Sequence, residues 1–375
     1  MPRPFALASL FLLSLTSAAS ALSSCVAFDA NWNLIAFNFG GKDYNAGTQD
    51  NWNSANPTDI TAQGRPPFDG PNVSCYLSQF TNAIYVLGAD SSNPTAVYLY
   101  DAAAKSWSTQ SVKADDGNKF DPTNFGAILD HDTNVFYAYS KGELFSLDME
   151  LLKAASSTTK QWMDVQTVPW DASSYEPTMA LAQNHVHFLG VPGVPAGSAK
   201  IFVIHFSFMQ PEPQSYGQFP NTHGQVTSFF KDEGVQTQFA FIPDDGSATY
   251  VIDVTSNTTQ SLKAPSAKDS KATYFASTNA LVQLSSSGSV AYLPFDAQTA
   301  DKSGADWVAI TKLPTASASS ASGSGSGASP SGTAGTSSGS SGSAGSTHDN
   351  GALTSPFADR WVWSVVGLLT GFALF

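Results

Sequence analysis

Short apolar segments separated by Gly, Pro, Asn and Asp recur along residues 22–314 of this chain. They have the length of β-strands, and no stretch keeps the 3.6-residue apolar period of an amphipathic helix. One exception is Asp148–Ala155, where the sequence DMELLKAA predicts a short helix inside a loop. The pattern therefore predicts an all-β domain over residues 22–314.

The strands come in repeating units. Six units begin with the apolar strands Leu34–Phe39, Ile84–Leu87, Val135–Tyr139, Val186–Leu189, Phe239–Ile242 and Ala280–Leu284. A second strand follows in five of them, at Val97–Tyr100, Leu144–Leu147, Ile201–Phe206, Tyr250–Asp253 and Val290–Phe295, with Asp101, Asp148, Asp253 and Asp296 at or near four of the strand ends. A period of ~40–50 residues with several strands per unit is typical of a β-propeller. We expect six blades, with five or seven left open.

One unit carries a recognisable motif. Its strand Ile84–Leu87 is followed by Gly88-Ala89, then by the strand Val97–Tyr100 and by Trp107. This arrangement resembles a kelch repeat, although Ala89 stands where the family has a second Gly. The resemblance implies a kelch-like β-propeller, and a fold of this kind does not specify a function.

The first 21 residues have the pattern of a secretory signal peptide. Arg3 is followed by an apolar run from Phe5 to Leu15, and Ala19-Ser20-Ala21 forms a cleavage site. We therefore expect residues 1–21 to be removed and the protein to be exported.

The other end has the pattern of a glycosylphosphatidylinositol (GPI) anchor signal. The apolar tail Trp361–Phe375 ends at the last residue, is shorter than the ~20 residues of a membrane-spanning helix, and follows a polar spacer. Small residues at Asn350-Gly351-Ala352 complete the signal and make Asn350 the expected attachment point. Residues 351–375 would then be removed, leaving the protein on the outer face of the cell membrane, with the cell wall as the second expected location.

Residues 315–350 change in composition to Ser, Gly, Ala and Thr. A segment of this kind buries too little apolar surface to fold, so we expect a disordered stalk that holds the propeller away from the membrane. The layout of domain, stalk and anchor resembles that of fungal cell-wall proteins.

Cys25 and Cys75 are the two cysteines of the chain, and they lie one period apart. Each precedes the first strand of its unit in our assignment. Equivalent positions in neighbouring blades are close in space, so we expect a disulfide in the oxidising secretory compartment. The sequons Asn72-Val73-Ser74 and Asn257-Thr258-Thr259 make Asn72 and Asn257 candidates for N-glycosylation.

Candidate catalytic chemistry is sparse. His185 and His187 lie two residues apart on one strand and would point to the same side, which makes them weak metal candidates without a third ligand fixed by spacing. The copper radical oxidases of the kelch-like propellers need two Tyr, two His and a Tyr-linked Cys, but the cysteines here are better explained by a disulfide. We expect no cofactor and no metal.

The acidic groups that could serve a glycosidase are numerous, but no pair stands out. They are Asp115, Asp116, Asp130, Asp132, Glu176, Asp244 and Asp245. Most are expected to form turns, and Asp244-Asp245-Gly246 is expected to connect two strands of a hairpin.

The formal net charge of −13 argues against nucleic acid as a partner. We therefore expect a non-enzymatic module that binds a cell-surface or wall glycan or protein, with a secreted carbohydrate-active hydrolase as the alternative. The loop Asn45–Pro57, which contains Trp52, is a candidate for stacking on sugars, although a loop that simply covers the ring is the simpler expectation.

Overall fold

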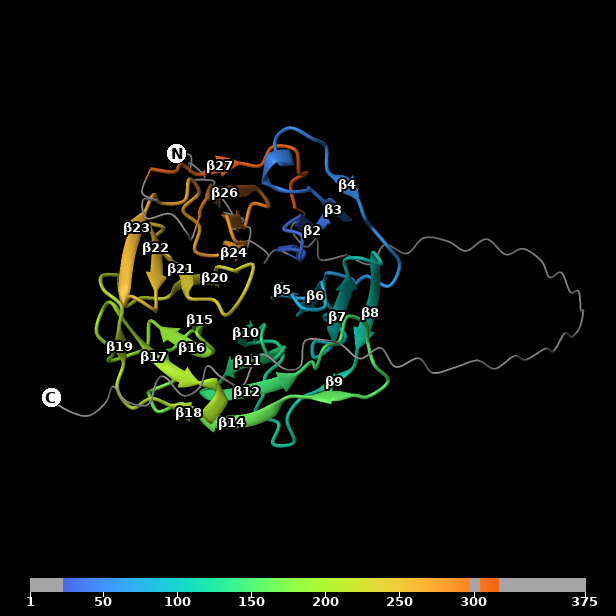
Figure 1. Ribbon diagram of the computed structural model, residues 1–375. Coiled ribbons are helices and arrows are strands. Elements are labelled where there is room, and N and C mark those ends of the chain that lie inside the picture. The colour runs from blue at the N-terminus through green and yellow to red at the C-terminus, as the bar shows by residue number, and fades with distance from the viewer. Residues whose placement is uncertain (1–22, 297–303, 317–375) are drawn as a thin grey trace, which may run out of the picture. The chain divides into compact units, whose positions relative to one another are not determined.

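The computed structural model describes residues 23–296 and 304–316, whose strands form six main sheets (Figure 1). The first three are blade 1 (β1 Cys25–Phe28, β2 Leu34–Phe39, β3 Lys42–Asn45, β4 Thr58–Asp59), blade 2 (β5 Ser74–Ser78, β6 Ala83–Leu87, β7 Val97–Asp101, β8 Ser106–Gln110) and blade 3 (β10 Gly126–Asp130, β11 Val135–Ser140, β12 Glu143–Asp148, β14 Met163–Thr167).

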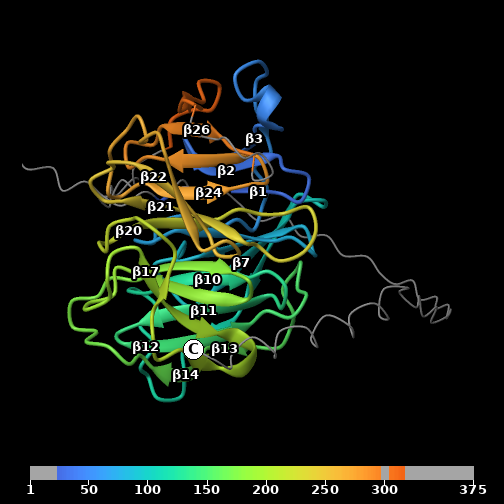
Figure 2. The same cartoon turned by 60° about the vertical axis from the view of Figure 1, so that its left-hand side comes forward.

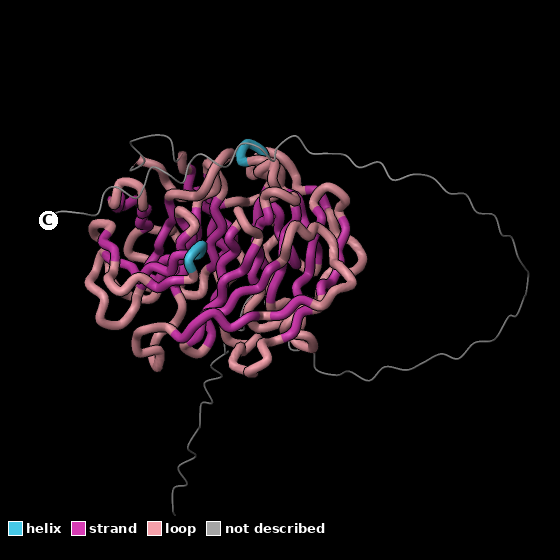
Figure 3. The backbone as a smooth tube through the Cα atoms, turned by 60° about the horizontal axis from the view of Figure 1, so that its bottom comes forward, coloured by secondary structure: helices cyan, strands magenta, loops and turns pink. Residues whose placement is uncertain are grey.

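The other three are blade 4 (β15 Thr178–Ala182, β16 His185–Leu189, β17 Ser198–Val203, β18 Phe208–Met209, β19 Gln214–Ser215), blade 5 (β20 Gly224–Ser228, β21 Gln238–Pro243, β22 Thr249–Asp253, β23 Thr258–Leu262) and blade 6 (β24 Thr273–Ala276, β25 Ala280–Leu284, β26 Val290–Pro294, β27 Val308–Ala309). A parallel pair, β9 (Val112–Lys113) with β13 (Lys160–Gln161), connects loops of blades 2 and 3. The helical content of the described residues is two short 3-10 helices, η1 (Gln49–Asn51) and η2 (Ile204–Phe206), coloured cyan in Figure 3.

Each blade is a contiguous, antiparallel stretch of chain, and the first strand of each blade lies innermost. These strands contact one another in the cyclic order β1, β5, β10, β15, β20 and β24, and β24 contacts β1 again. The ring therefore closes between blades 6 and 1, and the fold is a six-bladed β-propeller, as the repeat count predicted. Figure 2 shows the same blades from a second direction.

Burial explains why the middle strands could be found in the sequence. Alternate residues of one strand enter different hydrophobic clusters, as in β6, where Ile84 packs between blades 1 and 2 and Tyr85 packs between blades 2 and 3. Since both faces of a blade are covered, β6 and β25 are buried along their whole length. A strand of this kind appears as a continuous apolar run.

Three expectations are corrected. Residues 148–155 form no helix; Asp148 instead ends β12, and its Oδ1 accepts a hydrogen bond from the N–H of Glu150, which has a φ of +52°. The segment predicted as the strand Ile201–Phe206 ends at Val203 and continues as η2. Cys25 and Cys75 do not precede the first strands of their blades but lie within β1 and β5.

The two ends of the ring are named here by strand direction. Face A is the end at which the innermost strands begin, and face B is the end at which they finish. The described chain starts and stops at face A, because Asn38 Nδ2 donates to Ser23 O and the N–H of Ala316 donates to Gly288 O.

No helix in the described parts of the chain is long and apolar enough to cross a membrane. The expected signal peptide, most of the stalk, Asn350 and the anchor signal lie outside the described residues.

Candidate functional site

The innermost strands surround a central channel. Three of the five residues of β10 and four of the five residues of β20 are partly exposed, whereas β11 and β21, the next strands outward, are almost entirely buried. The residues of these innermost strands are therefore partly exposed because an open space runs along the axis of the ring. That space is a cavity of about 260 Å³, lined by residues of all six innermost strands.

The lining of the cavity is uncharged. Its described residues are aliphatic, aromatic, hydroxyl-bearing or amide-bearing, together with Gly, Pro and the cystine, and no Asp, Glu, Lys, Arg or His is among them. At face A the cavity reaches Asn72, Phe125 and Pro177, each of which is at least partly exposed, so it communicates with solvent there. A charged group would lose hydration in this channel without meeting an opposite charge.

Side chains tie neighbouring innermost strands together around the channel. Tyr76 donates its hydroxyl to the carbonyl of Ala127 at 3.1 Å, which joins blades 2 and 3. Between blades 4 and 5, Ser228 Oγ donates to the carbonyl of Leu181 at 2.7 Å and accepts from its N–H at 3.1 Å. Burial raises the pKa of Tyr76 to about 12, so this hydroxyl stays protonated and remains a donor.

At face B the loop between β20 and β21 (residues 229–237) closes the channel. Phe230 is 8% exposed, and its ring lies 5.7 Å from Trp32 of blade 1, 5.9 Å from His131 of blade 3 and 6.2 Å from Phe275 of blade 6. Backbone carbonyls of the same loop accept hydrogen bonds from Gln79 Nε2 of blade 2 and from the N–H of Gln183 of blade 4. One loop of blade 5 thus contacts all five other blades, and we call it the plug.

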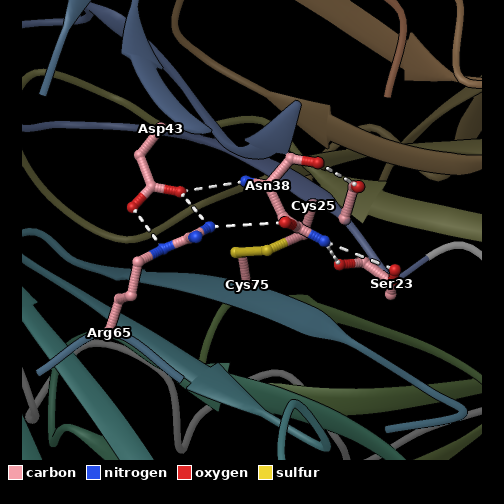
Figure 4. The surroundings of a disulfide bond; sticks show 7 residues. Ser23, Cys25, Asn38, Asp43, Arg65 and Cys75 are labelled. Atoms are coloured by element: carbon pink, nitrogen blue, oxygen red, sulfur yellow. Dashed lines mark hydrogen bonds and ion pairs between the residues drawn. A yellow bond between two sulfur atoms is a disulfide. The ribbon is translucent and has the colours of Figure 1, made fainter. Parts of the chain in front are cut away.

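At face A the junction of blades 1 and 2 is held by a disulfide and an ion pair (Figure 4). Cys25 and Cys75 are bonded, with their Cα atoms 5.9 Å apart, which confirms the expected pairing. Beside them, Arg65 Nε and Nη2 donate to the two carboxylate oxygens of Asp43 at 3.0 and 2.7 Å. Burial raises the pKa of Asp43, while the N–H of Asn38 and Arg65 act in the opposite direction.

The His185–His187 pair lies on β16, and both ring nitrogens of His187 are occupied. Nδ1 lies 3.2 Å from the carbonyl of His185, which can only accept, so Nδ1 carries the proton and Nε2 accepts from the hydroxyl of Tyr216 at 3.0 Å. Burial lowers the pKa of His187 to about 3 and lowers that of His185 as well. The described residues contain no group of three or more His, Cys, Asp or Glu that could hold a metal ion.

The loop carboxylates act mainly as turn formers. Asp115 Oδ1 accepts the N–H of Phe120 at 2.8 Å, and Asp245 Oδ1 accepts that of Ser247 at 2.9 Å in the hairpin turn between β21 and β22, where the sequence predicted one. Asp116 accepts from the Gln161 side chain, and Asp130, whose pKa is raised by burial, accepts from Thr133.

Two further carboxylates flank a histidine at face A. His223 Nδ1 lies 2.7 Å from Asp244, and its Nε2 lies 3.7 Å from Glu176 of blade 4. These contacts connect blades 4 and 5 beside the open end of the channel.

Most of the large exposed hydrophobic side chains among the described residues lie at face B. Four of the six are in loops or at strand ends of that face: Phe80 67%, Leu151 67%, Phe206 81% and Phe208 52%. These four come from the consecutive blades 2, 3 and 4, and we call them the face B hydrophobic residues. Met163 and Val308 instead lie on the outermost strands β14 and β27, opposite the middle of β12 and β26.

The loop with Trp52 covers the ring and presents no aromatic surface. Trp52 is 1% exposed, packs against Phe28 and Tyr292, and donates its indole N–H to the carbonyl of Gly47 at 2.8 Å. Next to it, Asn53 bonds to Ala309 and Thr311 of blade 6. The loop therefore helps to close the ring between blades 6 and 1, and stacking of Trp52 on a sugar is ruled out in this arrangement.

The two sequons lie at opposite ends of the ring. Asn72 is exposed at face A, at the rim of the cavity, and its Nδ2 donates to the carbonyl of Thr123 at 3.0 Å. Asn257 is exposed in the turn between β22 and β23 at face B, with a φ of +55°. Both positions are accessible, and their glycosylation stays a prediction.

Sequence reasoning missed the plug and the face B hydrophobic residues. Phe229-Phe230 followed by Lys231-Asp232-Glu233-Gly234 looks like a strand end and a polar turn, so nothing local shows that Phe230 crosses the channel. The exposed Phe206 and Phe208 flank Ser207, whose φ of +47° marks a tight turn. The sequence signal for this surface was the pair of aromatic residues Phe206 and Phe208 on either side of a turn, a place where polar residues are expected.

No family model matches the chain, and a search of curated proteins found no match. Among solved structures, the chain is similar to one from the crystal structure of a nidogen/laminin complex, with 10% sequence identity and a TM-score of 0.40, over 64% of this chain and 79% of that one. A similarity of this size carries no conclusion about function.

Proposed function

We propose that this protein is a non-enzymatic binding module on the outside of the cell, and that face B of its propeller docks a protein partner. The observation that carries the proposal is the location of the face B hydrophobic residues, which are four of the six large exposed hydrophobic side chains among the described residues. Exposed apolar residues gathered on one face, with a polar surround, are typical of interaction sites.

The exposed side chains indicate the chemistry of the partner. Phe206 and Phe208 offer flat apolar rings without a polar group, which suits burial against apolar protein side chains. The exposed charges of this face include Asp148, Asp232 and Glu233 and, with opposite sign, Lys105 and Lys153, while Glu150 is paired with Lys160. The acidic excess favours a partner with a basic rim around an apolar centre. The plug fills the middle of this face, so the surface is not interrupted by the channel.

The expected position of the stalk is compatible with a partner that docks at face B. The described chain ends at face A with Ala316, just where the Ser/Gly-rich segment begins, so a stalk would leave from the end opposite to the face B hydrophobic residues. We propose that the stalk leads to a GPI anchor at Asn350, in a layout that resembles fungal wall proteins, with a kelch-like repeat in the propeller.

Binding is tested with the full-length secreted protein on intact cells and on wall preparations. Replacing Leu151, Phe206 and Phe208 by Ser should lower protease-sensitive binding at least tenfold, because large apolar anchors dominate interface energies. The control variant Glu176→Ser changes an exposed residue of face A and should bind like the wild type. Equal binding by the triple variant, or turnover of wall polysaccharides by the wild type, would overturn the proposal.

Anchoring is tested separately with a phospholipase specific for phosphatidylinositol. The enzyme should release the protein from cells, and Asn350→Pro should send it into the medium without that treatment. Retention on cells after phospholipase treatment would reject the GPI anchor but leave the binding proposal open.

A further inference from the structure

Gln236 leaves a polar atom buried beside the central cavity. The residue is 3% exposed, it lines the cavity at the closed end, and its Oε1 has no hydrogen-bond partner. A buried acceptor without a partner is costly, so a donor is needed at this place. Gln236 lines the cavity, although its Oε1 is itself out of reach of a water molecule, so a rotation of the amide would bring this acceptor to a donor placed in the cavity.

Further hydrogen-bonding groups face the same space. β10 and β20 lie at the inner edges of their sheets, so one side of each backbone has no strand to pair with. Thr227 on β20 and Thr273 on β24 add hydroxyl groups to the lining. Hydroxyl groups can donate and accept, so they match a mixed set of N–H, C=O and O–H groups better than a pure donor or acceptor does.

An apolar surface closes the bottom of the cavity. Phe230 and Phe275 both line it, with their rings nearly parallel at 13° and their centroids 6.2 Å apart. The face of an aromatic ring carries partial negative charge and attracts C–H groups. A ligand with a C–H face as well as hydroxyl groups would satisfy both kinds of surface.

Charge and size narrow the class of ligand. The described lining residues carry no charge, which disfavours acids, amines and phosphates. The cavity of about 260 Å³ is smaller than the ~300–1,000 Å³ of sites that hold drug-sized ligands. We propose that the cavity binds one ring of an uncharged polyhydroxy compound, such as a neutral hexose, which enters from face A. This site is independent of the protein-docking surface on face B.

Such a sugar has two possible sources, an external glycan and the chain itself. Asn72 lies at the open end of the cavity and belongs to a sequon, so a glycan on Asn72 would place neutral sugars at the rim. The experiment therefore uses full-length protein from a eukaryotic host in two forms, the wild type and Asn72→Gln.

Both forms are titrated with glucose, mannose and galactose, and with glucuronate and glucosamine as charged comparators, by calorimetry and ligand-observed NMR. We expect at least one neutral hexose to bind saturably to the Asn72→Gln protein, and neither charged sugar to bind. Binding to the wild type as well would indicate an external ligand, whereas binding only after Asn72→Gln would identify the chain's own glycan as the occupant. Absence of neutral-sugar binding up to tens of millimolar, or equal binding of the charged sugars, would overturn the proposal.

Variants locate the site. In the Asn72→Gln background, Gln236→Leu should weaken hexose binding at least fivefold, the usual effect of one lost hydrogen bond. The matched control is Gln238→Leu, which removes another amide with an unpartnered Oε1, two residues away and outside the cavity. Thr227→Met, which adds bulk to the lining, should also weaken binding if Gln236→Leu does not fold. Unchanged affinity in either folded cavity variant would reject the site.

Discussion

The two ends of the channel are held by different physical means. At face A the innermost strands of blades 1 and 2 are joined by the Cys25–Cys75 disulfide, next to the Arg65–Asp43 ion pair. At face B the described residues form no disulfide, and the end is closed by Phe230, packed against rings from three other blades. The disulfide holds the innermost strands of blades 1 and 2 together where the channel is open, whereas an apolar ring packed between several blades closes the channel at face B. This difference fits our proposals that a small molecule enters the channel at face A and that a protein partner docks at face B.

The largest expected effect comes from removing the covalent link at face A. Cys25→Ser with Cys75→Ser should lower the free energy of unfolding by about 4 kcal/mol, because the bond closes a loop with a sequence separation of 50. Urea unfolding of the variant and of the reduced wild type measures the difference. A loss below about 1 kcal/mol would show that the ion pair and packing hold this end without the disulfide.

The next effect tests the apolar closure of face B. Phe230→Ala should cost about 3 kcal/mol, since the buried ring leaves a cavity that its neighbours fill only in part. Phe208→Ala is the matched control, because Phe208 is 52% exposed and its truncation should cost no more than about 0.5 kcal/mol. Equal stabilities of the two variants would contradict the role of Phe230 as a plug.

Acid should destabilise the propeller at His187, which belongs neither to the disulfide junction of face A nor to the plug of face B. His187 has a folded-state pKa of about 3, below its unfolded value of 6.5, because burial disfavours the charged imidazolium. Its contribution to stability is complete above pH 6.5 and is lost as the pH falls toward 3. Between pH 7 and about pH 4.5 the loss should be about 2–3 kcal/mol.

Chemical unfolding as a function of pH measures this loss, and His187→Phe should flatten the profile over the same range. An identical slope in the variant would show that other groups cause the acid sensitivity. Hydrogen exchange should then localise the acid-induced opening to blades 4 and 5, where His187 bonds to Tyr216.

The smallest effect on folding is expected at the docking surface. Phe206→Ser with Phe208→Ser should change the free energy of unfolding by no more than about 0.5 kcal/mol, because both rings are already largely in water. Thermal unfolding and solubility are the measurements, and solubility should rise. A large loss of stability would mean that these rings support the fold and would weaken their assignment to binding.

The sequence predicted some strands well and others poorly, and burial accounts for the difference. Leu34–Phe39 and Ala280–Leu284 were predicted with the observed bounds, because both faces of these strands are covered by neighbouring blades. The outermost strands, such as β4, are short and exposed and have no apolar signature. The helix predicted at residues 148–155 failed because Asp148 favours a side-chain-bonded turn over a helix start there.

The sequence by itself determined the repeat, the all-β class and the pairing of Cys25 with Cys75, since apolar periodicity and spacing are properties of the chain. The tertiary structure decided which residues meet on the axis. Phe230 became a plug, Gln236 became a buried acceptor and Trp52 became part of the ring closure only when blades far apart in sequence came together. Local patterns report how much of a strand is covered, but the partners across a closed ring depend on how all six blades pack.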